Sequence, residues 1–169
     1  SPSDAMMAQA FSVFSYKMKG PLYIRLERGK CSQIYHKSLP DISKGFNLIK
    51  KGSDLLLLAT GAMVERALEV SRELENKSIK AGVIDLYRIK PVERESLLAI
   101  FKRTKRLVTI EEQILNGGIG SLISEILSDS GNNKLLKRIA VADDLCFAHG
   151  DRRYLQTRCG LDLCSATKM

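Results

Sequence analysis

The chain has 169 residues, a formal net charge of +8 and 44% hydrophobic residues, which favours one main folded domain and excludes a globally disordered chain. No apolar run approaches the roughly 20 residues that a membrane-spanning helix needs, so we expect no membrane partner. The basic residues are dispersed in short groups beside apolar segments, so we expect no nucleic-acid partner, and affinity for phosphorylated metabolites explains the charge equally well.

The first segment, residues 3–28, is predicted to form a helix followed by a strand. Asp4 has the chemistry of a helix N-cap, and apolar residues then recur at helical spacing until Gly20 and Pro21 stop the helix. Residues 22–26 have the composition of a strand. Because one helix and one strand cannot bury their apolar faces alone, we expect the end of a domain whose remainder is missing.

Residues 29–45 show glycine, serine and proline without a clear period, which predicts a linker between domains. From about residue 46 the pattern alternates regularly. Strands are predicted at 54–59, 81–86, 107–110 and 136–141, helical stripes at 64–74, 97–101 and 119–127, and the start of a C-terminal helix at 154–159. Such alternation predicts an α/β fold, a three-layer α/β/α arrangement with a mostly parallel sheet.

The most site-like feature follows the third predicted strand, where Glu111 and Glu112 precede a glycine-rich turn at 116–121. Ligands often bind at this edge of an open parallel sheet, and the start of a helix can hold an anion. The dinucleotide fingerprint G-x-G-x-x-G fails, however, because its third position is Ile123, and two carboxylates would repel a pyrophosphate. We therefore rank a tight structural turn or a subunit contact above a nucleotide site.

No self-sufficient catalytic set is visible within residues 46–169. Glu111 and Glu112 could be acid and base, but adjacent strand residues point to opposite faces and cannot easily share one substrate atom. His149 follows the fourth predicted strand without a visible partner and is interpreted as structural.

The four cysteines do not form a recognisable metal-binding pattern. Neither a CxxC spacing nor a histidine at ligand spacing occurs among Cys31, Cys146, Cys159 and Cys164. The pattern favours free thiols in a reducing compartment, so we expect a cytoplasmic protein without a zinc site.

Four segments resemble the transketolase family of thiamine-diphosphate-dependent enzymes. Residues 20–30, which read GPLYIRLERGK, look like the end of the family's pyrimidine-binding domain. Residues 52–61, 83–91 and 109–121 are similar to three successive motifs of the family's C-terminal domain. Because these motifs occur in the family's order and span nearly the whole chain, the chain is identified as a member of this family.

The tail narrows the resemblance. Residues 144–153 and 160–162 resemble the ending of 1-deoxy-D-xylulose-5-phosphate synthase, whereas residues 25–29 are nearer to the broader transketolase form. The first resemblance implies condensation of pyruvate with glyceraldehyde 3-phosphate, a step of isoprenoid biosynthesis. The alternative is transketolase proper, which transfers two-carbon ketol units between sugar phosphates.

The resemblance also implies a domain division. Residues 1–30 would end a pyrimidine-binding domain, residues 31–45 would be a linker, and residues 46–169 would be the C-terminal domain. Thiamine diphosphate and Mg²⁺ would be bound in the complete enzyme across a dimer interface, by domains that this chain lacks. We therefore expect a homodimer with missing N-terminal domains or a partner subunit, phosphorylated sugar substrates, and a chain that binds no cofactor or metal and is inactive alone.

One substrate-binding residue carries over from the resemblance. Arg28, which precedes Gly29, matches the family's arginine that contacts substrate phosphate, a role suited to a bidentate guanidinium. Arg25 is the second candidate. A surface arginine at the end of a strand would look the same in the sequence.

Two other classes of function stay open at this point. One is a non-catalytic assembly or regulatory module that keeps the domain for dimerisation, and an upstream thiamine-binding region with a G-D-G motif would argue against it. The other is a nucleotide-binding α/β module that uses the glycine turn, which soaking with nucleotides would test.

Overall fold

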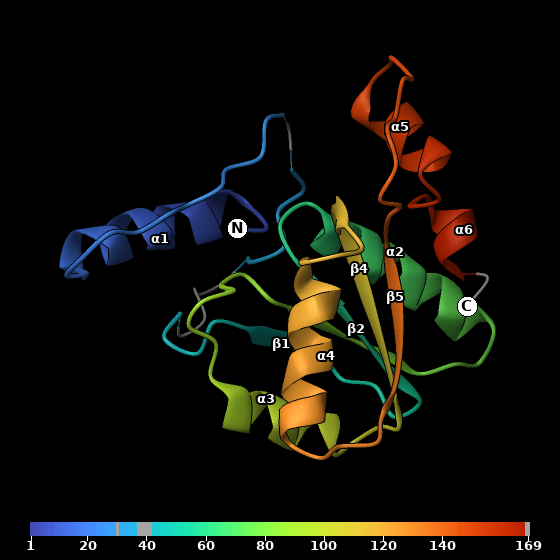
Figure 1. Cartoon of the computed structure of the whole chain (residues 1–169), viewed down its shortest axis with the longest axis horizontal. Coiled ribbons are helices and arrows are strands. Elements are labelled where there is room, and N and C mark those ends of the chain that lie inside the picture. Colours follow the sequence, from blue (N-terminus) through green and yellow to red (C-terminus); the bar gives the residue numbers. More distant parts are fainter. Residues whose placement is uncertain (30, 37–41, 168–169) are drawn as a thin grey trace.

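A five-stranded sheet forms the centre of the molecule in the computed structural model, which describes residues 1–29, 31–36 and 42–167 (Figure 1). The strands are β1 (Asn47–Lys50), β2 (Leu55–Ala59), β3 (Ala81–Asp85), β4 (Arg106–Ile114) and β5 (Leu135–Val141). Their order in space is β1-β3-β2-β4-β5, with β1 antiparallel to β3 and the other neighbours parallel. The predicted α/β fold with a mostly parallel sheet is confirmed.

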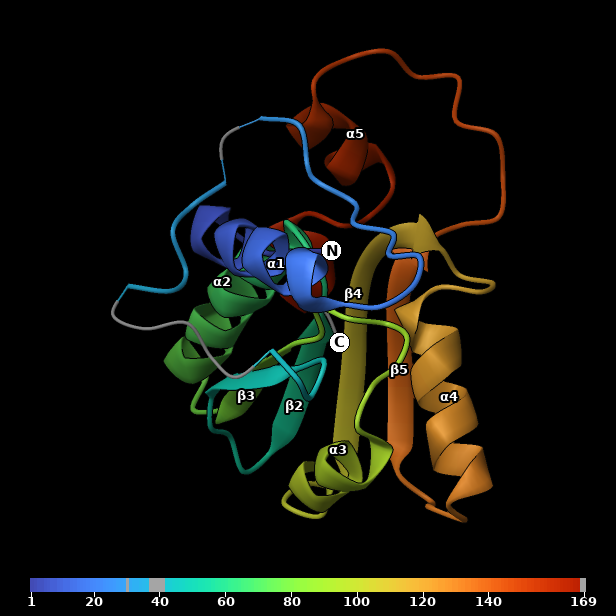
Figure 2. The ribbon, with the colours of Figure 1, turned by 90° about the vertical axis from the view of Figure 1, so that its left-hand side faces the viewer.

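Helices cover both faces of this sheet, as Figure 2 shows for α2 and α4. The helices are α1 (Ala5–Lys17), α2 (Met63–Asn76), α3 (Arg94–Phe101), α4 (Ile119–Asp129), α5 (Arg152–Arg158) and α6 (Leu163–Thr167). α2 and α6 pack on one face, whereas α3 and α4 pack on the other. In the part of the chain that the structure describes, no helix is long and apolar enough to cross a membrane.

The central strand β2 explains why the core strands show no alternation in sequence. Leu55, Leu57 and Ala59 pack into the cluster beneath α2, whereas Leu56 and Leu58 pack into the cluster beneath α3 and α4. Because helices bury both faces, every position of the strand is apolar.

The first helix docks on the rest of the chain through its N-terminal half. Asp4 caps α1 as predicted, because its carboxylate accepts the N–H of Met7 at 2.8 Å. Met7 and Phe11 then pack against Tyr35 and Tyr87 in a third apolar cluster. This part of the helix thus buries its apolar face against the rest of the described chain.

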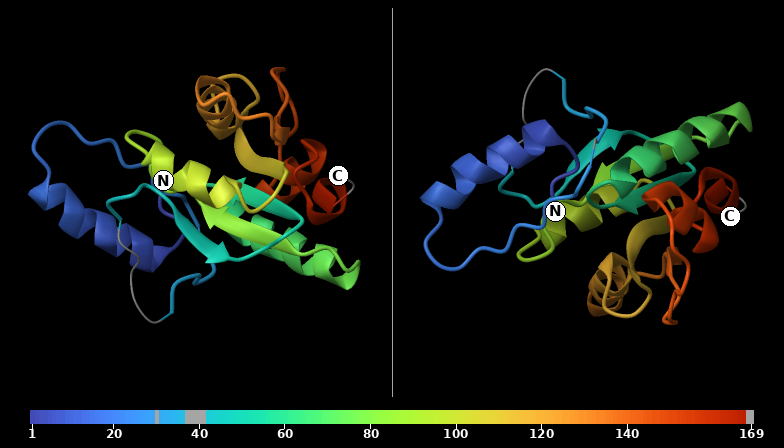
Figure 3. Two further views of the ribbon diagram at one scale, coloured as in Figure 1. Left: turned by 90° about the horizontal axis from the view of Figure 1, so that it is seen from below. Right: turned by 90° about the horizontal axis from the view of Figure 1, so that it is seen from above.

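The predicted strand at residues 22–26 is wrong. These residues form no strand and pair with none in the described structure, and the side chains of Tyr23 and Leu26 are exposed. A strand needs a neighbour to complete its ladder of hydrogen bonds, and none is adjacent here. The far part of α1, which extends away from the sheet in Figure 3, is also exposed at Val13 and Tyr16.

Smaller differences concern short elements and boundaries. β1 and α6 were not predicted, the third predicted strand extends over the whole of β4, and α5 begins two residues earlier than its pattern indicated. In the predicted linker, Tyr35 is buried against the domain, and positions 30 and 37–41 lie outside the described residues.

Candidate functional site

An open cavity of about 350 Å³ lies at the carboxyl edge of the parallel strands. The strand order reverses here, because β3 lies on one side of β2 and β4 lies on the other. Open α/β sheets bind ligands at such a reversal. Thr60 after β2, Gln113 of β4 and Gly118 before α4 line the cavity, together with Tyr23 and Arg25 of the front segment.

The charged side chains of the cavity wall are basic, whereas most of the other lining residues are apolar or uncharged. Arg25, Arg88 and Lys90 line the cavity, and no described lining residue is a carboxylic acid. The Arg88 side chain is held in place, because its Nε donates to the carbonyl oxygen of Pro91 at 2.7 Å. A wall of this composition favours an anionic ligand.

The Glu111 carboxylate occupies the position at the start of α4 where an anionic ligand could bind the helix N–H groups. It is fully buried, and its two oxygens accept the N–H groups of Ile119 at 2.6 Å and Gly120 at 2.8 Å. A Cβ on Gly118 would lie 2.0 Å from Glu111 Oε2, so only glycine fits there. Burial raises the pKa of Glu111, and the two N–H groups only partly offset the rise. The geometry supports the structural turn over the nucleotide site, because a phosphate would compete with Glu111 for the same N–H groups.

Glu112 points the other way and enters a polar cluster, which we call the Arg152 cluster: Glu27, Glu112, Arg152 and Gln156. Arg152 Nε donates to Glu112 Oε1 at 2.8 Å, and Gln156 Nε2 donates to the same oxygen at 2.7 Å. Although burial opposes it, hydrogen bonding to Arg152 and Gln156 lowers the pKa of Glu112. The prediction that the two adjacent glutamates cannot share one substrate atom agrees with this arrangement.

The two arginines of the front segment lie in different surroundings. Arg25 lines the cavity, and its Nη2 lies 3.6 Å from Glu27 Oε1. Arg28 is exposed and makes no hydrogen bond or ion pair with a described residue. The structure thus brings Arg25 to the cavity wall and leaves the Arg28 guanidinium in solvent.

Sequence reasoning missed a buried carboxyl group at the end of β3. Asp85 Oδ2 accepts the hydroxyl groups of Ser3 at 2.6 Å and Tyr35 at 2.9 Å, and Oδ1 has no partner among the described residues. Burial raises the pKa of Asp85 to about 7, although the two hydroxyl groups favour the ionised form. An aspartate that ends an apolar strand is the only signal that the sequence offered.

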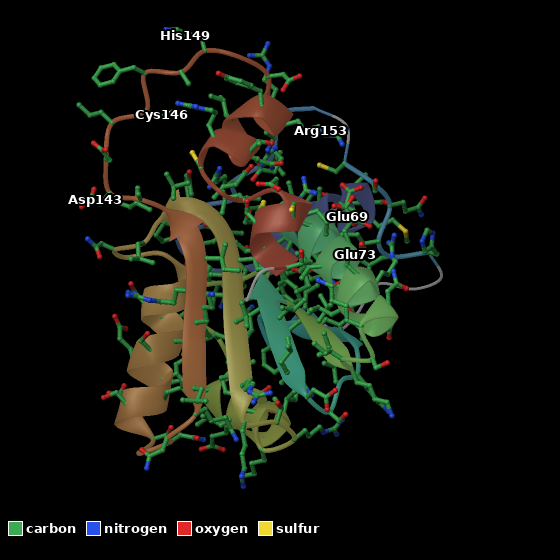
Figure 4. All side chains as sticks on the ribbon, turned by 90° about the vertical axis from the view of Figure 1, so that its right-hand side faces the viewer. Glu69, Glu73, Asp143, Cys146, His149 and Arg153 are labelled. Atoms are coloured by element: carbon green, nitrogen blue, oxygen red, sulfur yellow. The ribbon has the colours of Figure 1, made fainter. Side chains whose placement is uncertain are left out.

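His149 and the cysteines do not assemble into a reactive centre in the described structure. Figure 4 places Cys146 and His149 on the loop between β5 and α5, away from Glu69 and Glu73 of α2. His149 is exposed, and all four cysteines are free. No group of three or more His, Cys, Asp or Glu side chains among the described residues could hold a metal ion.

The layered sheet and the cavity at its carboxyl edge define an open-sheet α/β domain. The particular family follows from comparison: the chain belongs to the transketolase family, because residues 45–165 match the family described as "Transketolase, C-terminal domain". The resemblance noted in the sequence is therefore confirmed.

Three known proteins illustrate the relationship. A subunit of the apulose-4-phosphate transketolase of Actinobacillus succinogenes is 28% identical over 161 residues, which cover 95% of this chain and 52% of that protein. 1-Deoxy-D-xylulose-5-phosphate synthase 2 of Geobacter sulfurreducens is 34% identical over 164 residues, which cover 95% of this chain and 26% of that protein. A solved structure described as "Split gene transketolase, inactive beta4 tetramer" matches with a TM-score of 0.91 and 29% identity, covering 99% of this chain and 54% of that one. The chain thus spans about half the length of these proteins, or less.

Proposed function

We propose that the chain is the C-terminal part of a thiamine-diphosphate-dependent enzyme most like 1-deoxy-D-xylulose-5-phosphate synthase. Such an enzyme condenses pyruvate with glyceraldehyde 3-phosphate. The observation that carries the phosphorylated substrate of this proposal is the cavity at the carboxyl edge, whose charged side chains are basic and which Arg25 of the front segment helps to line. In this proposal the chain supplies one edge of the substrate site, and Arg28 or Arg25 contacts the substrate phosphate.

The proposal includes a larger assembly. Residues 1–30 would end a pyrimidine-binding domain, residues 31–45 would be a linker, and residues 46–169 would be the C-terminal domain of a cytoplasmic homodimer. The missing domains would lie on the same polypeptide or on a partner subunit. Relatives named as one subunit of a transketolase and as a split-gene product, each about twice as long as this chain, support either arrangement. The chain alone should be inactive.

The described residues do not fit thiamine diphosphate and its metal ion. A magnesium diphosphate needs oxygen ligands for the ion and donors for the phosphates. No metal-binding group gathers among the described residues, and Glu111 occupies the start of α4. We therefore place the cofactor and Mg²⁺ on the missing domains or the partner subunit.

Transketolase proper is the second candidate, favoured by the relative named as a transketolase subunit, which matches over 95% of this chain. To separate the two, the chain is purified with its thiamine-binding portion. The mixture is given either pyruvate and glyceraldehyde 3-phosphate, or a ketose phosphate donor and an aldose phosphate acceptor. Release of carbon dioxide with formation of a deoxy sugar phosphate supports the synthase, and ketol transfer supports the transketolase. Absence of both reactions in a correctly assembled complex would favour a non-catalytic assembly module.

A further inference from the structure

Glu27 lies between the two arginines of the front segment and is held by a helix at the other end of the chain. Its Oε2 accepts a hydrogen bond from Arg152 Nη2 at 2.9 Å, although the two residues are 125 positions apart. Only 12% of the Glu27 side chain is exposed, so solvent screens this contact less than a fully exposed ion pair.

Arg152 is fixed in turn by the sheet. Its Nε donates to Glu112 Oε1 at 2.8 Å, and its Nη2 also contacts Glu112 Oε2. Glu112 belongs to β4, which has β2 on one side and β5 on the other. The fork of a guanidinium can satisfy two carboxylates at once, which an ammonium group does poorly. Hydrogen bonding to Glu112 also raises the pKa of Arg152, so its charge is permanent.

We propose that Arg152 is a positioning residue: by bridging Glu112 of the sheet and Glu27 of the front segment, it holds the segment that carries Arg25 and Arg28 at the carboxyl edge. The inference rests on the proposed function, because it takes one of these arginines to contact the substrate phosphate. Arg152 itself acts through Glu27.

Removal of the guanidinium would act first on the front segment. Glu27 and Glu112 are 12% and 17% exposed in their side chains, and they would share a site without the cation that joins them. Glu112 is anchored in a central strand. Residues 22–26 pair with no strand among the described residues, so the front segment should detach from the sheet edge more easily than Glu112 moves.

The first measurement follows the front segment in the full chain, without any cofactor or substrate. Trypsin can cut after Arg25 and after Arg28, and mass spectrometry gives the rate of each cut under native conditions. Arg152→Gln should raise both rates about fivefold or more, since the loss of a charge-assisted contact increases local opening. Arg153→Gln, at the exposed neighbouring position of α5, is the matched control and should leave both rates unchanged. Glu27→Gln should act like Arg152→Gln, and the double variant should add little.

The second measurement uses the chain assembled with its thiamine-binding portion. Arg152→Gln should raise KM for the phosphorylated substrate severalfold and change KM for the unphosphorylated substrate much less, in the same direction as substitution of Arg25 or Arg28. Arg152→Lys should recover only part of the loss. A purely structural role would lower activity towards both substrates equally.

The two measurements separate the inference from the function on which it rests. Unchanged tryptic rates in Arg152→Gln overturn the inference whatever the kinetics show. The inference is also overturned if Arg152→Gln raises the tryptic rates but changes the two KM values equally. This outcome requires that Arg25→Ala or Arg28→Ala still raises KM for the phosphorylated substrate more than for the other. If neither arginine variant is selective, the proposed phosphate contact fails, while raised tryptic rates still support the role of Arg152 in holding the segment.

Discussion

At the scale of single residues, Arg28 and Arg25 are the two candidates for the phosphate contact, and each is tested by substitution. Arg28→Ala in the assembled enzyme should raise KM for the phosphorylated substrate roughly tenfold to hundredfold and leave KM for the unphosphorylated one nearly unchanged, because a charge-assisted contact is lost. Arg25→Ala, at the cavity wall, is measured in parallel. Arg103→Ala, an exposed arginine outside the lining of the cavity, is the control. Equal KM changes for both substrates would remove Arg28 from the site.

Glu111 has a structural role that can be measured without substrate. Glu111→Gln replaces one acceptor oxygen with an amide that cannot accept from the helix, so the free energy of unfolding should fall by about 1–3 kcal/mol. Chemical denaturation measures the change. Glu125→Gln, on the exposed side of the same helix, should have almost no effect. Micromolar binding of a nucleotide to the unsubstituted chain would contradict a turn already filled by Glu111.

Asp85 should make the stability of the folded chain depend on pH through a single carboxyl group. Its pKa is raised to about 7 in the folded chain, so the folded state binds the proton more tightly than the unfolded state does. This contribution to stability is complete below the unfolded pKa and is lost as pH rises through 7. Its slope is on the order of 1.4 kcal/mol per pH unit at most.

Asp85→Asn should abolish that part of the slope between about pH 4 and pH 7. Urea denaturation at a series of pH values compares the variant with the unsubstituted chain. Asp54→Asn serves as the control, since hydrogen bonding to the Lys80 backbone lowers rather than raises the pKa of Asp54. An unaltered slope in Asp85→Asn would show that this carboxyl group is ionised in the folded chain.

At the scale of elements, the N-terminal half of α1 packs on the domain through an apolar cluster that contains Phe11. Phe11 is 3% exposed, and its ring centroid lies 5.8 Å from that of Tyr87 in an edge-to-face arrangement. Phe11→Ala should release α1 and so increase the hydrogen exchange of its backbone amides. The free energy that holds the helix on the domain should fall by about 3 kcal/mol. Val13→Ala on the 56% exposed position of the same helix should leave exchange unchanged. Equal exchange in both variants would mean that other contacts hold the helix.

The elements that could be predicted from the sequence are those whose apolar residues form a clear run or a clear helical stripe. The apolar runs of β2, β3 and β4 are buried on both faces, and the stripes of α2 and α4 are amphipathic, so their patterns are strong. β1 has four half-buried residues, and α6 has five residues with one buried side chain, which is too little to produce a pattern.

The candidate site was predictable only in part, for a related reason. The tight turn was predicted from its glycines, and the divergence of Glu111 and Glu112 follows from strand geometry. The contacts of Arg152 and Asp85 could not be predicted, because they join residues far apart in the sequence that share no local pattern. The same holds for residues 22–26, whose strand-like composition found no neighbour in the described structure.

At the scale of the whole molecule, the chain alone should not bind the family's cofactor. Calorimetric titration of the isolated chain with thiamine diphosphate and Mg²⁺ should give no measurable heat of binding, because the described residues contain no metal-binding group and α4 already holds a carboxylate. The chain assembled with its thiamine-binding portion is the positive control. Micromolar affinity of the isolated chain would place the cofactor on this domain.

The hydrogen bond between Glu27 and Arg152 closes a loop of 125 positions, and this sets an order of events during folding. Contacts of such long range form late, because earlier burial must offset the entropy of closing the loop. During synthesis, residues 22–29 leave the ribosome long before α5 does. Glu27 therefore cannot yet bind the guanidinium of Arg152. In the proposed arrangement, the arginines of the front segment therefore take their places only after α5 has been made.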